Sequence, residues 1–165
     1  MKTSRIHTIT SIILLSVIFL SCSKEEKYTV DNQQVTGQLA YTRQSFIPLQ
    51  FDSLTQMPVL ASITLTGTGS LPYLGAITMV STFNFDLVQG RGYDFVTTYT
   101  GADEADCFAA TGSSQMQRDG SILVTESFSS GKGKFAKISG GGNTSVLLLP
   151  DGSAGSGTVD WRITY

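Results

Sequence analysis

The chain has 165 residues, of which 41% are hydrophobic and 15% charged, with 17 glycines and a formal net charge of -2. A length near 150 residues normally forms one core, and the low charged fraction argues against a disordered chain. The acidic balance and the lack of a basic cluster argue against nucleic-acid binding. Composition therefore predicts one globular domain and leaves its ligand open.

Residues 1–21 have the form of a secretory signal peptide. Lys2 and Arg5 precede an apolar run over residues 12–20, and the run stops at Ser21 and Cys22. A membrane-spanning helix needs about 20 apolar residues, and this run is about half that length. We expect the segment to direct export and then to be removed.

Cys22 is the predicted lipidation site. The pair Ser21-Cys22 at the end of the apolar run resembles the lipobox of bacterial lipoproteins, in which the cysteine is acylated and becomes the first residue. Phe19 and Leu20 depart from the commonest form of that motif. Several acyl chains at one cysteine would give stable membrane attachment. The alternative is a cleaved, soluble export signal with a chance cysteine.

The residues that follow, Ser23, Lys24, Glu25 and Glu26, are similar to the short acidic tags that send some lipoproteins to the outer face of the outer membrane. The alternatives are a solvated charge run and an anchor facing the periplasm. Residues 22–34 are polar and predict a lipidated N-terminal tether, with the globular domain at 35–165.

Export also restricts the chemistry of the mature chain. His7 is the only histidine and leaves with the signal, and Cys107 is the only cysteine besides Cys22. Histidine-based catalysis, zinc sites and intrachain disulfides are therefore excluded. Removing Lys2 and Arg5 leaves 9 of the 11 basic side chains against 13 acidic ones.

Residues 35–165 predict an all-β domain. Helical periodicity is missing, and glycine or a cluster of Ser, Thr, Asn and Asp interrupts the chain every 8 to 12 residues or so. We expect about eight strands, near residues 37–43, 59–66, 77–87, 93–100, 107–112, 121–129, 144–149 and 158–165. Asp119-Gly120 and Asp151-Gly152 predict tight hairpins, so that neighbouring strands run antiparallel. A single β-barrel is favoured, with a β-sandwich as the alternative.

The last strand alternates most clearly. Val159, Trp161, Ile163 and Tyr165 are expected to face the core, while the residues between them, including Arg162 and Thr164, face water. A strand at the chain terminus is well placed to close a sheet. Residues 77–87 show the same alternation, with Ile77, Met79, Phe83, Phe85 and Leu87 on one face.

Three glycine-rich segments resemble the barrel family of allene oxide cyclase and the dirigent proteins, particularly its small bacterial exported members. They are residues 65–75 (LTGTGSLPYLG), 98–101 (TYTG) and 131–140 (GKGKFAKISG). The resemblance spans roughly residues 64–159 and implies an antiparallel eight-stranded barrel with a central apolar cavity. Turn motifs argue for a fold more than for an activity. The polar catalytic residues of the plant members have no counterpart that we can place, so no catalytic residue is assigned.

Three other features were candidates for chemistry. Asp103, Glu104 and Asp106 form the densest acidic cluster, but the loop spacing of an EF-hand is missing, and we expect a solvated loop without metal. Cys107 begins an apolar segment and is expected to be a small buried hydrophobic residue rather than a nucleophile. The glycine-rich turn carries lysines that predict either an anion site or a solvated turn, at Lys132, Lys134 and Lys137.

The aromatic residues leave the interior of the barrel open to two interpretations. Of 9 Phe, 6 Tyr and 1 Trp, only Phe19 lies in the export segment. Such rings either fill a small barrel or line a cavity for one apolar ligand. Both arrangements place the same side chains inward, so the sequence does not distinguish them.

Together these features predict a lipid-anchored, non-enzymatic barrel at the outer membrane that binds a small apolar ligand or a surface component. No cofactor and no nucleic-acid partner are expected. The alternatives are a cofactor-free cyclase or isomerase that uses an apolar cavity, and a structural envelope protein. An aromatic cavity with two or more converging polar groups would favour the enzyme, and a filled interior the other two.

Overall fold

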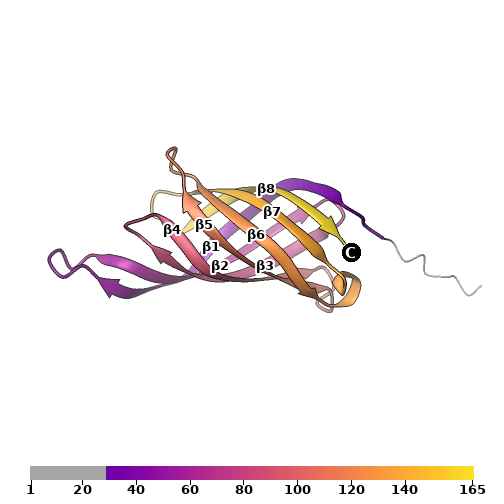
Figure 1. The fold of residues 1–165 in the computed structure, drawn as a ribbon, viewed down its shortest axis with the longest axis horizontal. Coiled ribbons are helices and arrows are strands. Elements are labelled where there is room, and N and C mark those ends of the chain that lie inside the picture. The colour runs from indigo at the N-terminus through magenta and orange to yellow at the C-terminus, as the bar shows by residue number, and fades with distance from the viewer. Residues whose placement is uncertain (1–28) are drawn as a thin grey trace, which may run out of the picture.

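The computed structural model describes residues 29–165. The signal peptide, Cys22 and the four residues of the predicted export tag all lie outside this range. Within it the chain forms a closed antiparallel barrel in which each strand pairs with the next and the last pairs with the first (Figure 1). The prediction of a single antiparallel β-barrel of about eight strands is confirmed, and the sandwich alternative is wrong.

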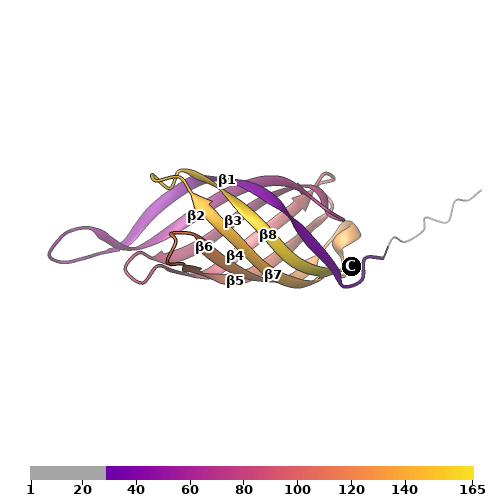
Figure 2. The ribbon, with the colours of Figure 1, turned by 90° about the horizontal axis from the view of Figure 1, so that it is seen from above.

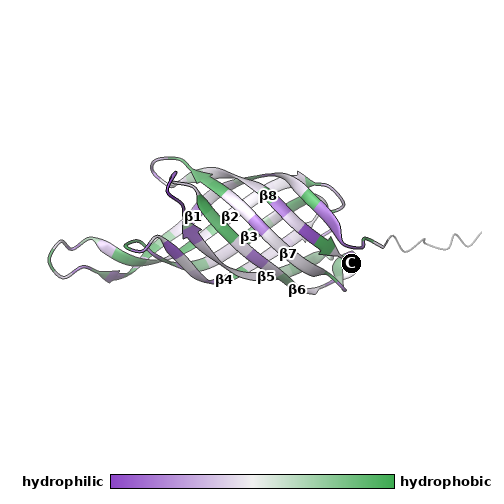
Figure 3. Ribbon diagram, turned by 45° about the horizontal axis from the view of Figure 1, so that its top comes forward, coloured by the Kyte–Doolittle hydropathy of each residue, from purple (hydrophilic) through white to green (hydrophobic). Residues whose placement is uncertain are grey.

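The eight strands follow the predicted order but are mostly longer than predicted. They are β1 (Gln33–Phe51), β2 (Pro58–Leu71), β3 (Gly75–Asp86), β4 (Arg91–Gly101), β5 (Cys107–Met116), β6 (Ile122–Gly131), β7 (Ser139–Leu148) and β8 (Ala154–Thr164). The described residues contain no α-helix, only a single 3-10 turn, η2 (Gly133–Phe135), between β6 and β7. Figure 3 shows hydrophobic and hydrophilic patches along the strands, with nearly neutral stretches between them.

The barrel begins earlier than the predicted boundary at residue 35. Val30 is only 2% exposed, and it exchanges two backbone hydrogen bonds with Tyr165, at 3.0 and 2.8 Å. Gln33 and Gln34 already pair with β8. The last residues of the predicted tether are therefore part of the barrel, because an apolar side chain next to the C-terminal strand is more stable inside than in water.

The closing strand has the predicted orientation. Val159, Trp161 and Ile163 are at most 1% exposed, and Arg162 points to solvent. β8 pairs with β7 on one side and with β1 on the other, which closes the sheet. Thr164 differs from the prediction: it is half-buried, because its hydroxyl accepts a hydrogen bond from the backbone N–H of Asn32 at 2.9 Å.

The two ends of the barrel differ. Both chain ends of the described part and the β2–β3, β4–β5 and β6–β7 connections lie at one end, which we call the plugged end (Figure 2). Phe135 of η2 is fully buried there, together with Leu74 and Ile138. The other end, which we call the mouth, carries the four remaining hairpin turns, at residues 52–57, 87–90, 117–121 and 149–153.

The β1–β2 hairpin extends beyond the rest of the barrel at the mouth (Figure 1). β1 pairs with β8 only as far as Thr42, and β2 pairs with β3 only from Leu60 onward. Residues 44–58 pair only within the hairpin. The extension exposes large apolar side chains, namely Ile47, Leu49, Phe51, Leu54 and Met57.

Three consecutive glycines of β7 lie very close to the backbone of the neighbouring strands. They are Gly140, Gly141 and Gly142, near the start of β7. A Cβ atom at Gly140 would lie 2.0 Å from the carbonyl oxygen of Arg162, and the residue has φ 118°. Glycine is required here because β7 approaches the backbone of its neighbours too closely for any side chain.

Candidate functional site

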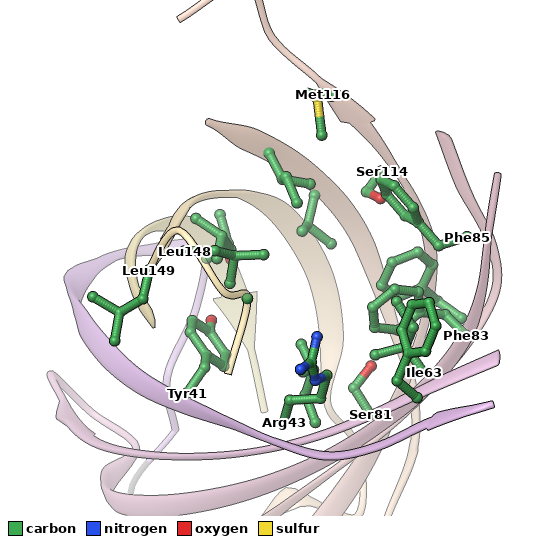
Figure 4. A pocket seen from close by; sticks show the side chains of 18 of the residues that line it. Tyr41, Arg43, Ile63, Ser81, Phe83, Phe85, Ser114, Met116, Leu148 and Leu149 are labelled. Atoms are coloured by element: carbon green, nitrogen blue, oxygen red, sulfur yellow. The ribbon is translucent and has the colours of Figure 1, made fainter. Parts of the chain in front are cut away.

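The interior of the barrel is filled at the plugged end and hollow at the mouth. The hollow part is a cavity of about 500 Å³, within the size range of small-molecule sites. In Figure 4, Tyr41, Leu148 and Leu149 line one side of it, and Ile63, Phe83 and Phe85 line the opposite side. Aromatic residues thus fill the plugged end and also line a cavity at the mouth.

An aromatic cluster forms one wall of the cavity. The rings of Phe83 and Phe95 are stacked with centroids 4.3 Å apart, and Phe85 meets Phe83 edge-on at 6.4 Å. Phe83 and Phe85 lie two residues apart on the inward face of β3, and Phe95 comes from the neighbouring β4. This cluster gives the cavity a rigid apolar face against which a flat or branched hydrocarbon can pack.

Tyr99 of β4 lies where the filled and hollow parts of the barrel meet. It is 1% exposed, and its ring stacks on Phe108 at 4.9 Å and meets Trp161 edge-on at 5.3 Å. Its hydroxyl donates to the carboxyl group of Glu126, with O–O distances of 2.8 and 3.0 Å to the two oxygens. The aromatic packing therefore holds a phenol in place beneath the cavity, aimed at a carboxyl group.

Glu126 is the most unusual residue of the site, because it is a carboxyl group in the apolar interior. It is 5% exposed and lies on β6 between the inward-facing Val124 and Phe128. Burial raises the pKa of Glu126, and hydrogen bonds from Tyr99 and Thr97 partly oppose this. A carboxyl group with a raised pKa in a cavity is a common feature of binding and catalytic sites.

Tyr41 of β1 supplies a second phenol. Its ring packs where two glycines leave room: a Cβ atom at Gly157 would lie 2.6 Å from Tyr41 Cε2, and one at Gly67 3.0 Å from Tyr41 Cδ1. Burial raises the pKa of Tyr41, and the charge of Glu126 adds to this effect. Two phenols and a carboxyl group therefore line the cavity, with Tyr99 hydrogen-bonded to Glu126 and Tyr41 within reach of its charge.

Other polar side chains on the inner face are mostly paired with one another. Ser81 and Thr97 share a hydrogen bond of 2.8 Å, and the indole N–H of Trp161 donates to Thr144 at 3.1 Å. Ser114 Oγ is the one buried side-chain nitrogen or oxygen between residues 29 and 165 without a partner. Glu126 and the two phenols are thus the main polar groups of a largely apolar lining, which also contains the unpaired Ser114.

Arg43 lies at the mouth of the cavity. Its guanidinium lies 5.6 Å from the ring centroid of Phe46. The pKa of Asp151 is lowered mainly by hydrogen bonds from Ser153, with a smaller contribution from the charge of Arg43. Around them the rim is apolar and partly exposed, with Leu87, Met116, Leu148 and Leu149.

The acidic cluster predicted as a loop has a structural role at the plugged end. Asp106 Oδ1 accepts the backbone N–H of Lys134 at 2.8 Å, and Asp103 Oδ1 accepts that of Ala105 at 2.9 Å. Glu104 is exposed. The described residues contain no group of three or more His, Cys, Asp or Glu side chains that could hold a metal ion.

The three lysines and Cys107 contribute nothing to the cavity. Lys134 Nζ lies 3.7 Å from Asp106 Oδ2 and 4.8 Å from the ring centroid of Phe135, so it fastens η2 to the β4–β5 turn. Lys132 and Lys137 are exposed. Cys107 was expected to be buried, but it is half-buried and has a free thiol, because it lies at the start of β5 beside the surface loop.

Glu126 was not among the predicted site residues, although the sequence carries a signal for it. In the predicted strand at residues 121–129, Val124, Glu126 and Phe128 share one face, and Thr125 and Ser127 share the other. A carboxyl group among apolar residues on the inward face indicates a buried charge. A single inward carboxyl group is less conspicuous along the chain than the acidic cluster at residues 103–106.

Comparison with known proteins identified no matching family model, curated protein or solved structure. Among residues 29–165, no helix is long and apolar enough to span a membrane.

Proposed function

We propose that this protein binds one small, predominantly apolar molecule inside the barrel, with the polar end of that molecule at Glu126, Tyr99 and Tyr41. The observation that carries this proposal is the cavity of about 500 Å³ that opens at the mouth and ends on a buried carboxyl group. Sites for small molecules are typically apolar and have a few polar groups that fix orientation. A structural envelope protein has no need of such a space.

The energetics favour an apolar ligand. Moving apolar surface out of water contributes roughly 25 cal/mol per Å², and the aromatic wall of Phe83, Phe85 and Phe95 presents that surface in a fixed arrangement. Because the strands already hold the wall in place, little conformational entropy is lost on binding.

Binding is tested with N-phenyl-1-naphthylamine, a neutral apolar dye whose fluorescence rises in apolar surroundings. We expect one equivalent to bind the native protein. Val124→Trp places a large ring in the cavity and should weaken binding at least about tenfold, whereas Ser127→Trp places the same ring on the outer face of β6 and should not. Equal binding by both variants would show that the dye lies elsewhere.

A cofactor-free isomerase or cyclase is the second candidate, favoured by the two phenols that meet the carboxyl group of Glu126 in an aromatic cavity. A carboxyl group with a raised pKa can take up and return a proton, and a phenol can stabilise an enolate oxygen. In this case Glu126 would be the acid–base group, with Tyr41 or Tyr99 as hydrogen-bond donor. The resemblance to allene oxide cyclase and dirigent proteins is compatible with this candidate and stays a prediction.

The catalytic candidate is tested with an apolar β,γ-unsaturated ketone, whose conversion to the conjugated isomer is followed by ultraviolet absorbance. Glu126→Gln should abolish turnover while the dye still binds. If the native protein binds the ketone without converting it, binding alone is the function.

For localisation, we propose that the chain is exported and anchored to the outer membrane through lipid at Cys22, displayed at the cell surface by residues 23–26. The support is the sequence of residues 1–26. Val30 lies at the plugged end of the barrel, so a tether that precedes it attaches at that end. The cavity would then open away from the point of attachment.

A further inference from the structure

The floor of the cavity carries an acidic group without a basic partner. In the part of the chain that the structure describes, the one ion pair joins Lys134 to Asp106 at the plugged end. Arg43 also lines the cavity, but its guanidinium lies over Phe46, and its charge acts on Asp151. Glu126 therefore lacks the compensation that a buried carboxyl group normally has.

In the hydrogen bonds at Glu126, the carboxyl oxygens are the acceptors. Tyr99 donates to both of them, and a hydrogen bond from Thr97 also lowers the pKa of Glu126. A carboxylate has about four lone-pair sites, so acceptor capacity remains. A ligand group that reaches the floor must then be a donor, because a carboxylate or phosphate there would meet like charge.

The rings around the floor suit a positive charge. Tyr41 and Tyr99 are the titratable groups that face Glu126, and both are phenols, which remain neutral when burial raises the pKa of each. The neighbouring strands β5 and β7 present only Gly112 and Gly142 opposite Glu126. Aromatic faces attract ammonium groups, and more strongly where water is excluded.

Resting on the proposed binding function, we propose that the ligand is an apolar amine whose ammonium group donates to Glu126 while its hydrocarbon part lies against the aromatic wall. The ligand enters as an ammonium ion that already carries its N–H bonds. Where Glu126 is protonated before binding, its O–H bond breaks and that proton passes to the solvent, so the pair forms without a net change of charge in the cavity. An ammonium–carboxylate hydrogen bond is about twice as strong as a neutral one. The site would therefore distinguish an amine from an alcohol of equal size.

The experiment compares octylamine, octanol and octanoate by isothermal titration calorimetry at pH 7. Octylamine should bind the native protein about tenfold or more tighter than octanol, and octanoate should bind most weakly. In Glu126→Gln the preference for octylamine over octanol should disappear. Glu104→Gln, at an exposed carboxylate of the same chain, should keep the native preference.

Two measurements keep the result clear if Glu126→Gln folds poorly. Tyr99→Phe retains the carboxyl group and should retain the amine preference. In the native protein, titration at a pH below the pKa of Glu126 should release a proton on octylamine binding, seen as different heats in buffers of different ionisation enthalpy. Octanol should release none.

The outcomes separate this inference from the proposed function. If octanol binds and octylamine binds no tighter, or if Glu126→Gln keeps the preference, the ligand is not recognised as an amine, while cavity binding stands. If the native protein binds neither the dye nor any of the three octyl compounds, both proposals fail.

Discussion

Tyr99 places its hydroxyl against both carboxyl oxygens of Glu126, at 2.8 and 3.0 Å, although the two residues lie on strands that are not neighbours. β4 carries Tyr99, β6 carries Glu126, and β5 separates them in the sheet. The contact therefore passes over the inner face of β5. It ties β4 to β6 at the level where the filled core ends and the cavity begins.

The raised pKa of Glu126 predicts how stability depends on pH. Because folding raises this pKa above its ordinary value of 4.5, the folded chain binds more protons than the unfolded one just above pH 4.5. The free energy of unfolding should then fall as pH rises from 4.5 through the folded pKa. Glu126→Gln should flatten this slope in urea melts between pH 4 and 8.

Glu104→Gln is the control for that measurement, since Glu104 is exposed, and it should keep the native slope. The lowered pKa values of Asp52, Asp119 and Asp151, caused mainly by hydrogen bonds within their own turns, act in the opposite direction and only below about pH 4. A Glu126→Gln variant with an unchanged slope would contradict the assignment of the pH dependence to this carboxyl group.

Trp161→Ala should be the most damaging single truncation in β8. Trp161 is 1% exposed, and its indole N–H donates to the buried Thr144. We expect a loss of about 3–5 kcal/mol in the free energy of unfolding, from the lost burial and the cavity left behind. Thr158→Ala, on the outer face of the same strand, should cost less than about 1 kcal/mol. Denaturant melts that rank the two variants equally would contradict the inward orientation of Trp161.

Gly157→Ala should reduce the size of the cavity indirectly. The new Cβ atom would lie 2.6 Å from the ring of Tyr41 and 2.9 Å from its hydroxyl, so the ring must shift. We expect a loss of about 1–3 kcal/mol in stability and weaker binding of N-phenyl-1-naphthylamine. Adding Tyr41→Leu should recover part of the stability. Ser156→Ala, on the exposed face beside it, is the matched control and should change neither quantity.

Replacing Cys22 by serine should abolish lipid attachment. The product should lack acyl label from a radioactive fatty acid and partition into the aqueous phase in detergent extraction. If the serine variant carries the same label as the native chain, another residue is the anchor.

The surface tag is tested separately. Substituting Lys24, Glu25 and Glu26 together by alanine should leave the chain acylated, yet protect it from protease added to intact cells. Equal digestion of the native and substituted chains would show that these residues do not direct export.

The sequence predicts the barrel well because a half-buried strand alternates with period two wherever one face meets the core. Trp161 on β8 and Phe83 on β3 follow that period, and both point inward. Residues 44–57 were missed because the hairpin projects past the core, so no buried face imposes an alternation there.

The candidate site was harder to predict. Phe95 lines the cavity and Phe108 fills the core, yet both are aromatic residues on inward positions of predicted strands. Which one borders empty space depends on how rings from distant strands pack, and local patterns do not carry that information. Glu126 could have been found because it occupies an inward-facing position of a predicted strand. Its contact with Tyr99 depends on how the strands are arranged in the barrel.

A closed barrel has no free strand edge, but the β1–β2 extension provides one. Beyond Arg43, the described part of β1 pairs only with β2, so its other side presents backbone groups to solvent. Such an edge is a template for intermolecular strand pairing. Pro48 removes one N–H from it, and irregularities at residues 43–45 and 48–51 break its register. The same chain thus carries both the exposed edge and the means of keeping itself from polymerising.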